Sequence, residues 1–316
     1  MAKYILLRLL SVIPVLLIVA VIVFFLAHLA PGDPVTVILG EEASAEVKAE
    51  LRAELGLDLP LFTQFITWFK GILTGNLGDS FFLKMPITEV FFDHLSPTLS
   101  LAIMAQIIAV VIALTIGVLA ARNRGTFIDQ AVMSFSLLGI SIPSFLLGLL
   151  LVLLFAVKLQ WLPVAGYQPL NEGLIGHLRY LLLPAIALGT MQAALIARMT
   201  RSSMLDVLSG NYIKTAKSKG LKPGKVVYKH ALRNAFIPIL TVIGETFGTL
   251  ITGAVVVETI FNIPGIGQLI VNSIERRDFA VIQGTVLMIT VTYVLLNLVI
   301  DLLYGIVDPR LRLNRK

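Results

Sequence analysis

Long uncharged apolar runs dominate this sequence and recur along almost its whole length. Six of them approach the roughly 20 residues that a helix needs to cross a bilayer. Hydrocarbon offers backbone groups no water, and the runs lack the period-two alternation of barrel strands, so we predict an all-α membrane protein with six transmembrane helices. The runs cover residues 9–30, 98–121, 131–157, 180–197, 235–257 and 280–300.

The longest polar interval, residues 31–97, predicts two amphipathic helices. Ser44 can cap a helix that reaches Leu55, and Gly56 follows it as a stop signal. A second helix is expected over residues 61–73, followed by the glycine-rich turn GNLGDS. This interval is either a cap that packs on the spans or a docking surface for an external partner.

Positive charge gathers in alternate intervals between the runs. The positive-inside rule then places both termini in the cytoplasm and residues 31–97 outside it, as an extracytoplasmic elaboration between the first two helices. The residues behind this prediction are Lys3, Arg8, Arg122, Arg124, Arg198, Arg201, Lys214, Lys217, Lys219, Lys222, Lys225, Lys229, Arg233, Arg310, Arg312, Arg315 and Lys316.

Composition agrees with a protein whose solvent is the lipid bilayer. Hydrophobic residues make up 57% of the chain and charged residues 14%, and mean hydropathy is +0.91. The net charge of +6 follows the topology of the loops, so no nucleic-acid partner is expected. Cysteine is absent, which excludes disulfides and thiolate ligands. Pro31 follows the first run where a signal peptidase would cut, so that run is predicted to remain as an anchor.

These patterns divide the chain into four parts. Residues 1–30 form the first helix with its cytoplasmic start, and residues 31–97 form the extracytoplasmic segment. Residues 98–305 form a five-helix core that includes a cytoplasmic segment at 199–234, and residues 306–316 form a cytoplasmic tail.

The cytoplasmic segment contains its own helical hairpin. Tyr212, Ile213 and Ala216 predict an apolar and aromatic face on a short helix, which Gly220 ends before the chain returns toward the membrane. Such a piece can insert into a groove on a soluble partner. The alternative is a basic loop that enforces topology or holds anionic lipid.

The segment YIKTAKSKGL, followed by HALRNAFIP, resembles the EAA loop of ABC-importer permeases, in the form used by the dipeptide and oligopeptide permease family. Its Glu-Ala-Ala and Gly positions fall on Lys214, Thr215, Ala216 and Gly220, with Lys and Thr replacing the first two residues. Further motifs similar to this family's B-type member are APGDP at 30–34, LGLDLP at 55–60, GNLGDS at 75–80, SIPSF at 141–145, VVVETIFNIPGIGQL at 255–269, RRDFAVIQG at 276–284 and NLVIDLLYGIVDPR at 297–310.

The resemblance implies half of a translocation pathway in a bacterial inner membrane. It implies four kinds of partner: a second homologous permease, two cytoplasmic ATPase subunits, an extracytoplasmic substrate-binding protein and the lipid bilayer. The implied cargo is peptide, with glutathione, a nickel chelate or an oligosaccharide as alternatives. The residues implied to couple the chain to the ATPases are Tyr212, Lys214, Thr215, Ala216, Lys219 and Gly220, with Arg233 and Asn234 supporting the returning helix.

No enzymatic site is expected in the chain itself. The segment nearest to a phosphate-binding loop, residues 220–226, has too few residues between its glycines and Val226 after Lys225. The histidines at 28, 94, 177 and 230 are scattered, without metal-ligand spacing. We therefore expect no cofactor and no metal, with ATP bound by partner subunits. An ATP-independent secondary transporter is the less favoured alternative, because its inverted repeats are missing.

Four residues are candidates for the pore or its gate. Glu245 is a carboxylate in mid-span, which predicts contact with a cavity, or else an interhelical hydrogen bond to a Thr or Gln. Pro143 predicts a kink that serves either packing or gating. Pro264 and Gly265 lie in a turn-rich stretch that closes the pore, touches the binding protein or packs as a re-entrant loop.

Overall fold

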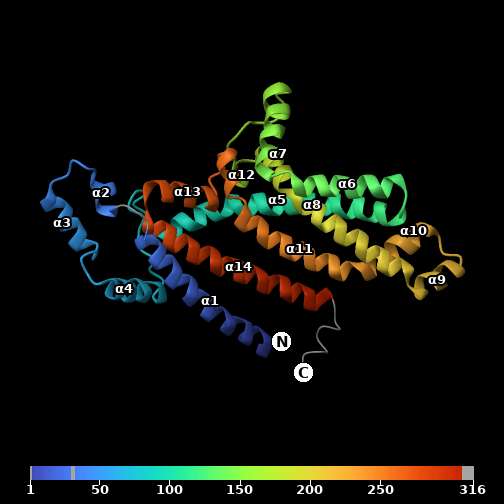
Figure 1. Ribbon diagram of the computed structural model, residues 1–316, viewed down its shortest axis with the longest axis horizontal. Helices are drawn as coiled ribbons and strands as arrows, with labels where there is room; N and C mark the ends of the chain where they lie inside the picture. The colour runs from blue at the N-terminus through green and yellow to red at the C-terminus, as the bar shows by residue number, and fades with distance from the viewer. Residues whose placement is uncertain (1, 30–32, 308–316) are drawn as a thin grey trace. The chain divides into compact units, whose positions relative to one another are not determined.

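The computed structural model describes residues 2–29 and 33–307, and within them the prediction of an all-α protein is confirmed (Figure 1). An isolated bridge between Asp79 and Pro86 is the one β-type pairing of these residues. The α-helices are α1 (Ala2–Leu29), α2 (Pro34–Leu39), α3 (Ala45–Glu54), α4 (Leu61–Leu73), α5 (Ile87–Arg122), α6 (Phe127–Ser141), α7 (Ser144–Leu151), α8 (Leu174–Ser209), α9 (Asn211–Ser218), α10 (Pro223–Lys225), α11 (Arg233–Gly253), α12 (Val255–Ile260), α13 (Ile266–Arg276) and α14 (Phe279–Val307).

Three shorter helical segments complete the list. Two are π-helices, η1 (Val152–Lys158) and η3 (Val226–Leu232), and η2 (Leu170–Glu172) is a 3₁₀ helix. Segment η3 joins α10 to α11 without a break, so residues 223–253 run as one helical stretch.

Four helical stretches among the described residues are long and apolar enough to cross a membrane: α5, α8, residues 223–253 and α14. A bent pair raises the number to five if it counts as one span. The predicted first span falls on α1, where the described apolar part, Ile13–Phe25, is shorter than a span. Six spans therefore stay a prediction. The predicted cytoplasmic termini concern Met1 and residues 308–316, which lie outside the described residues.

The bent pair corrects the prediction of one kinked helix over residues 131–157. Helix α6 ends at Ser141, and the next helical segment leaves at an angle of 99°; Figure 1 shows α7 turning away from α6. Ile142 is extended, with φ −84° and ψ 120°, as the residue before a proline prefers. Since Pro143 also lacks an N–H group, the sequence here breaks the helix and does not merely bend it.

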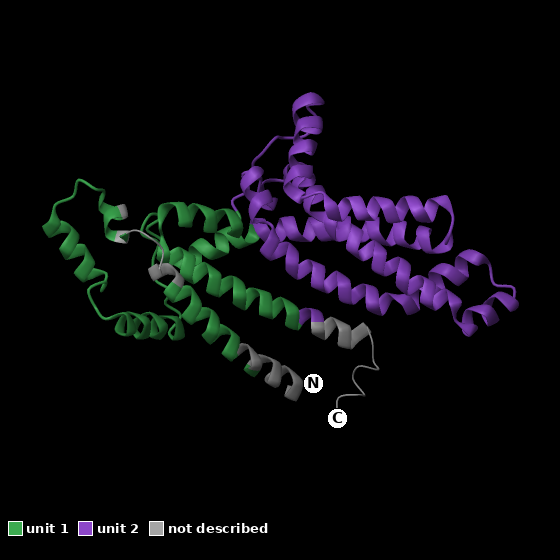
Figure 2. Ribbon diagram, in the orientation of Figure 1, with its two compact units in different colours: residues 1–96, 265–298 green, residues 97–264, 299–316 purple. Residues whose placement is uncertain are grey.

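The chain forms two compact units (Figure 2). Unit 1 comprises residues 1–96 and 265–298, and unit 2 comprises residues 97–264 and 299–316.

In unit 1 the two helices predicted for residues 31–97 are confirmed as α3 and α4. The Ser44 side chain accepts a hydrogen bond from the Val47 N–H (3.4 Å), and Gly56 takes φ +66° after the helix end. Helix α4 has the predicted bounds. Its aromatic side chains pack against Phe24 of α1, with Phe65 edge-on at 5.2 Å between ring centroids and Trp68 at 5.5 Å.

An ion pair joins the short helix α2 to α3 in the same unit. Arg52 donates from Nη2 to Oδ2 of Asp33 at 2.6 Å. Burial raises the pKa of Asp33, but hydrogen bonds from Thr36 and Val35 and the positive charge of Arg52 outweigh it, so the pKa lies below its ordinary value. The ionised carboxylate therefore caps α2 and holds α3 to it at neutral pH.

A buried aspartate fixes the start of α14. The Asp278 side chain accepts a hydrogen bond from the Val281 N–H (3.3 Å), which caps the helix, and another from the Ser80 hydroxyl (2.6 Å). The Ser80 oxygen in turn accepts from the Leu83 N–H at 2.9 Å. The GNLGDS turn is thereby attached to a helix almost 200 residues further along the chain.

Unit 2 is organised around α8, which packs against α6, α7 and α11. Small residues allow a close approach between α5 and α8. A Cβ atom on Gly189 would lie 2.7 Å from the Ala105 carbonyl oxygen, and one on Gly117 would lie 2.7 Å from Cβ of Thr200. The two helix backbones therefore leave no room for side chains at these positions.

We predict that Gly189→Ala destabilises the protein by about 1–3 kcal/mol, because the added methyl group overlaps a backbone oxygen that cannot rotate away. Helix propensity alone would favour alanine here. Thermal unfolding of the purified chain in mild detergent measures the difference.

Gly253→Ala is the matched control, because a Cβ atom there would meet nothing within 4 Å. Equal melting temperatures for the two variants would contradict the close packing of α5 and α8.

Candidate functional site

The segment predicted to be cytoplasmic forms a compact helical hairpin in unit 2, which we call the prong and define as residues 211–232. It comprises α9, a turn, α10 and η3, and α9 and α10 lie together at one end of the unit (Figure 1). The predicted short helix, glycine stop and returning helix are confirmed.

Two glycines and a proline explain the path of the prong. Gly210 is extended and separates α8 from α9, with its N–H bonded to the Val207 carbonyl at 3.1 Å. Gly220 has φ +76°, a conformation that costs other residues strain. Its N–H bonds to the Lys217 carbonyl at 2.9 Å. Pro223 then starts the returning helix, where its missing N–H is not needed.

The inner side of the prong belongs to the core of unit 2. Ile213 is 0% exposed, and burying such a side chain stabilises by about 1.5–3 kcal/mol. Ala216 and Leu221 are partly buried and pack against the apolar cluster to which Ile213 belongs. The buried cluster runs without interruption through α5, α8, α9, η3 and α11: Ala109, Ala113, Val118, Ala121, Ala193, Ile196, Ala197, Met204, Ile213, Val226, Val227, Ala231, Ala235 and Ile239.

The outer side of the prong is polar and basic. Tyr212 is 46% exposed, and its neighbours Lys214, Thr215, Lys219 and Gly220 are also exposed. The prediction that Tyr212 shares one face with Ile213 and Ala216 is wrong, because consecutive helical residues point in different directions. The aromatic side chain instead lies on the exposed side of α9, which also carries Lys214.

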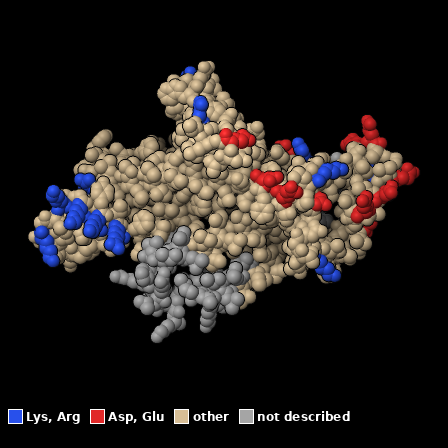
Figure 3. Space-filling view, turned by 180° about the vertical axis from the view of Figure 1, so that it is seen from behind, with Lys and Arg blue, Asp and Glu red and all other residues tan. Residues whose placement is uncertain are grey.

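Lys and Arg side chains gather over the prong end of unit 2, as the blue atoms at one end of Figure 3 show. A cavity of about 680 Å³ opens there. Its lining combines the positive charges of Arg122, Arg124 and Lys217 with apolar side chains such as Leu205 and Leu208. The sequence did not reveal this cavity, because it joins the end of α5 to residues about 90 positions later. Acidic groups are the chemistry that such a lining attracts.

Asn234, which is predicted to support the returning helix, bonds within that helix. Its side-chain amide donates to the His230 carbonyl at 2.7 Å, across the junction of η3 and α11. Arg233, predicted to act with it, is exposed at the first position of α11. A π-helix immediately before a spanning helix is an unusual local geometry that often marks functional segments.

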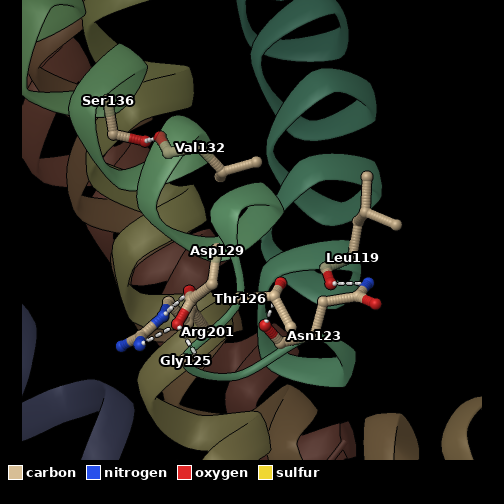
Figure 4. Close-up of polar contacts among 8 residues, drawn as sticks. All are labelled: Leu119, Asn123, Gly125, Thr126, Asp129, Val132, Ser136 and Arg201. Atoms are coloured by element: carbon tan, nitrogen blue, oxygen red, sulfur yellow. Dashed lines mark hydrogen bonds and ion pairs between the residues drawn. The ribbon is translucent and has the colours of Figure 1, made fainter.

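A bidentate ion pair joins α6 to α8, and its α8 residue precedes the prong in the sequence (Figure 4). Arg201 donates from Nε to Oδ1 of Asp129 at 2.6 Å and from Nη2 to Oδ2 at 2.7 Å. The Gly125 N–H also donates to this carboxylate, at 3.0 Å. The Asp129 side chain is 5% exposed and that of Arg201 25%. Asp129 was missed in the sequence, although a lone carboxylate in the first turn of an apolar helix is a usable signal.

The four pore candidates fall on three segments of the chain. Glu245 is exposed on α11, while the interhelical hydrogen bonds of this helix come from its neighbours: Gln106 donates to Thr246 at 3.2 Å. Pro143 lies at the break after α6. Pro264 is exposed, and Gly265 is buried as the N-cap of α13. The stretch predicted as turn-rich therefore leads directly into a helix that sequence reasoning missed.

Two family profiles match the chain. The first describes the binding-protein-dependent transport system inner membrane component and matches residues 113–313. The second describes the N-terminal part of the membrane component of such transport systems and matches residues 1–102.

Curated relatives match over nearly their full length. "Probable peptide ABC transporter permease protein y4tP" of Sinorhizobium fredii is 45% identical over 312 residues, covering 99% of this chain and 100% of the relative. "Glutathione transport system permease protein GsiC" of Salmonella choleraesuis is 44% identical over 312 residues, covering 99% of each chain.

A solved structure shares the fold. The chain resembles a subunit of the MetNI methionine ABC transporter in an inward-facing conformation, with a TM-score of 0.58 and 19% identity. The match covers 70% of this chain and 97% of the other. At this identity the likeness concerns the fold.

We predict that Asp129 and Arg201 are energetically coupled by about 1–3 kcal/mol, since removing one partner leaves a largely buried charge unpaired. A double-mutant cycle built on Asp129→Ala and Arg201→Ala, with unfolding followed in detergent, measures the coupling.

Arg198→Ala serves as the control, because Arg198 is an exposed arginine on the same helix. A coupling energy near zero would show that the pair does not hold α6 to α8.

Proposed function

The chain belongs to the family of binding-protein-dependent transport system inner membrane components, and from this premise we propose that it is one of two paired permease subunits in an ATP-driven peptide importer. It is a multi-pass protein of the inner membrane. In this proposal it forms half of the translocation pathway. The other permease, two ATPase subunits and a substrate-binding protein complete the machine.

The observation that carries the proposal is the contrast between the exposed outer side of the prong and its buried inner side. Its outer side offers an exposed tyrosine and exposed lysines, which suit a groove with acidic and apolar walls on a soluble subunit. Its inner side is anchored by Ile213 in the core that spans α5, α8 and α11. A partner that grips the outer side can therefore move membrane helices through packed side chains.

The basic loop that merely sets topology explains less of this geometry. Such a loop needs positive charge but no fixed conformation. The conformation of the prong is instead fixed by a glycine with positive φ, a proline at the start of the returning helix and a fully buried isoleucine. A shape held this firmly favours recognition by a folded partner. In the proposed importer, ATP is bound by the partner ATPase subunits.

Two relatives support the substrate class. One carries peptide transport in its name and the other glutathione, which is itself a short peptide. We propose that the cargo of this chain is a short peptide, glutathione included. In this proposal the substrate-binding protein makes most of the selection among peptides.

The proposal is tested by purifying the tagged chain in mild detergent with its native partners and measuring uptake of labelled peptide into proteoliposomes. It predicts that a second permease and soluble ATPases are found in the complex. It also predicts uptake only when ATP is supplied on the side of the membrane where the ATPases lie. A chain recovered alone that transports without ATP would overturn it.

We predict that Tyr212→Ala lowers ATPase co-purification and ATP-driven uptake at least fivefold, while the melting temperature of the isolated chain stays unchanged because the ring is exposed. Tyr293→Ala, a substitution of an exposed tyrosine on α14, is expected to leave ATPase binding intact. Equal effects of both substitutions would remove the prong from the ATPase interface.

We predict that Gly220→Val weakens coupling more than Gly220→Asn, because asparagine tolerates the φ of +76° better than a β-branched residue. Space is not the cause, since a Cβ atom at Gly220 meets nothing within 4 Å. The measurement is ATP hydrolysis stimulated by peptide and binding protein.

Gly224→Val is the control for this series, since Gly224 lies in equally open space without a positive φ. If all three variants behave alike, the shape of the prong does not matter for coupling.

A further inference from the structure

The exposed face of α11 is polar along the middle of the spanning helix. Thr241, Glu245, Thr249 and Thr252 are all exposed. Their spacing of four, four and three residues places them on one face of the helix. We call these four residues the α11 stripe.

On α5 and α14 the exposed side chains at mid-helix are mostly apolar, although Thr115 and Tyr293 are exposed as well. On α5 the apolar ones are Ile103, Ile107 and Val111, and on α14 they are Val291, Leu295 and Val299. Such surfaces suit lipid tails. The α11 stripe differs in kind because of its carboxylate. The three hydroxyls donate to carbonyls of their own helix, whereas the charge of Glu245 gains nothing from hydrocarbon.

Hydrogen bonds and packing fix the direction in which the stripe points. The opposite side of α11 is buried through Ile239, Leu250 and Ile251, and the helix packs on α8. Gln106 of α5 donates to the Ile243 carbonyl at 3.1 Å and to the Thr246 hydroxyl at 3.2 Å. Rotation of α11 about its axis would break these contacts, so the stripe is held on the outside of this chain.

Glu245 lies at the centre of the stripe. Its carboxylate is exposed, and the described residues offer it no hydrogen bond or ion pair. A lone carboxylate at this depth is costly against lipid and is stable against water or a cation. Charged residues are also depleted in the buried centres of protein interfaces, so a watery pathway suits Glu245 better than a dry contact.

We propose that the α11 stripe lines the translocation pathway and that Glu245 binds the ammonium group of the passing substrate. This inference rests on the proposed function and adds a substrate class to it: peptides with a free amino terminus or a lysine side chain. The threonine hydroxyls can exchange hydrogen bonds with peptide amides. A single carboxylate attracts the cation without enclosing it, which permits release.

The accessibility of the stripe is tested by cysteine labelling, for which the chain is suited because it contains no cysteine. Thr241→Cys and Thr249→Cys are compared with Ile107→Cys and Val111→Cys in the assembled complex, using a membrane-impermeant thiol reagent. We expect at least tenfold faster labelling of the two stripe positions, slowed by transported peptide. Equal rates for all four positions would overturn the inference.

The charge of Glu245 is tested by uptake of a matched pair, one peptide with a free amino terminus and its N-acetylated form. We expect Glu245→Gln to reduce uptake of the free peptide five- to tenfold and to leave that of the acetylated peptide nearly unchanged, with Glu245→Asp in between. Glu89→Gln, at an exposed carboxylate of α5, should affect neither peptide.

The outcomes separate this inference from the proposed function. Equal loss of both peptides with loss of the second permease from the complex would make Glu245 an assembly residue and overturn the inference. Unchanged, ATP-dependent uptake of both peptides would also overturn it, while the importer assignment stands. Absence of ATP-dependent uptake in the unmodified complex would instead overturn the proposed function.

Discussion

The burial of the inner side of the prong is the constraint on which the account depends. Ile213 has no exposed surface, and it belongs to the same apolar cluster as Met204 of α8 and Ala235 of α11. A hairpin at the end of a membrane protein would ordinarily be free to pivot. Here its displacement requires the helices beneath it to move as well, because closely packed side chains transmit strain and do not yield to it.

Other contacts in unit 2 hold the helices beneath the prong rigidly together, so that a displacement of the prong moves them as well. Gly117 and Gly189 bring α5 and α8 into backbone contact, and the Asp129 to Arg201 pair holds α6 to α8 where the prong begins. The same rigidity determines what α11 can present on its outer face. A helix pinned by Gln106 must keep Glu245 turned away from its own core. One stiff body thereby connects the basic outer side of the prong to the polar α11 stripe.

Local features of this structure were predictable from the sequence, whereas spatial coincidences were not. The helix from Ser44, the helix at 61–73 and the stop at Gly220 follow from capping, periodicity and glycine geometry, all of which act within a few residues. The helical break at Pro143 was predicted only as a kink, because a proline inside an apolar run can either bend a helix or end it, and Ile142 takes the extended conformation that ends it. The Ser80 to Asp278 bond and the Arg122 to Lys217 cavity join distant segments, for which a single sequence carries no signal. Tyr212 was predicted on the wrong side of its helix, since the sequence of so short a helix does not reveal which of two neighbouring apolar residues, Tyr212 or Ile213, is buried.

The central claim, that the prong and the membrane helices move as one body, is tested most directly by a distance measured within the working complex. Spin labels at Lys219→Cys on the prong and Thr115→Cys on α5, both exposed positions in a chain without native cysteine, allow this by pulsed electron paramagnetic resonance. The account predicts one narrow distance distribution that is the same in the absence of ATP and during ATP-driven transport. A distribution that broadens, or that shifts when ATP binds, would show that the prong pivots on the membrane helices and would contradict the account.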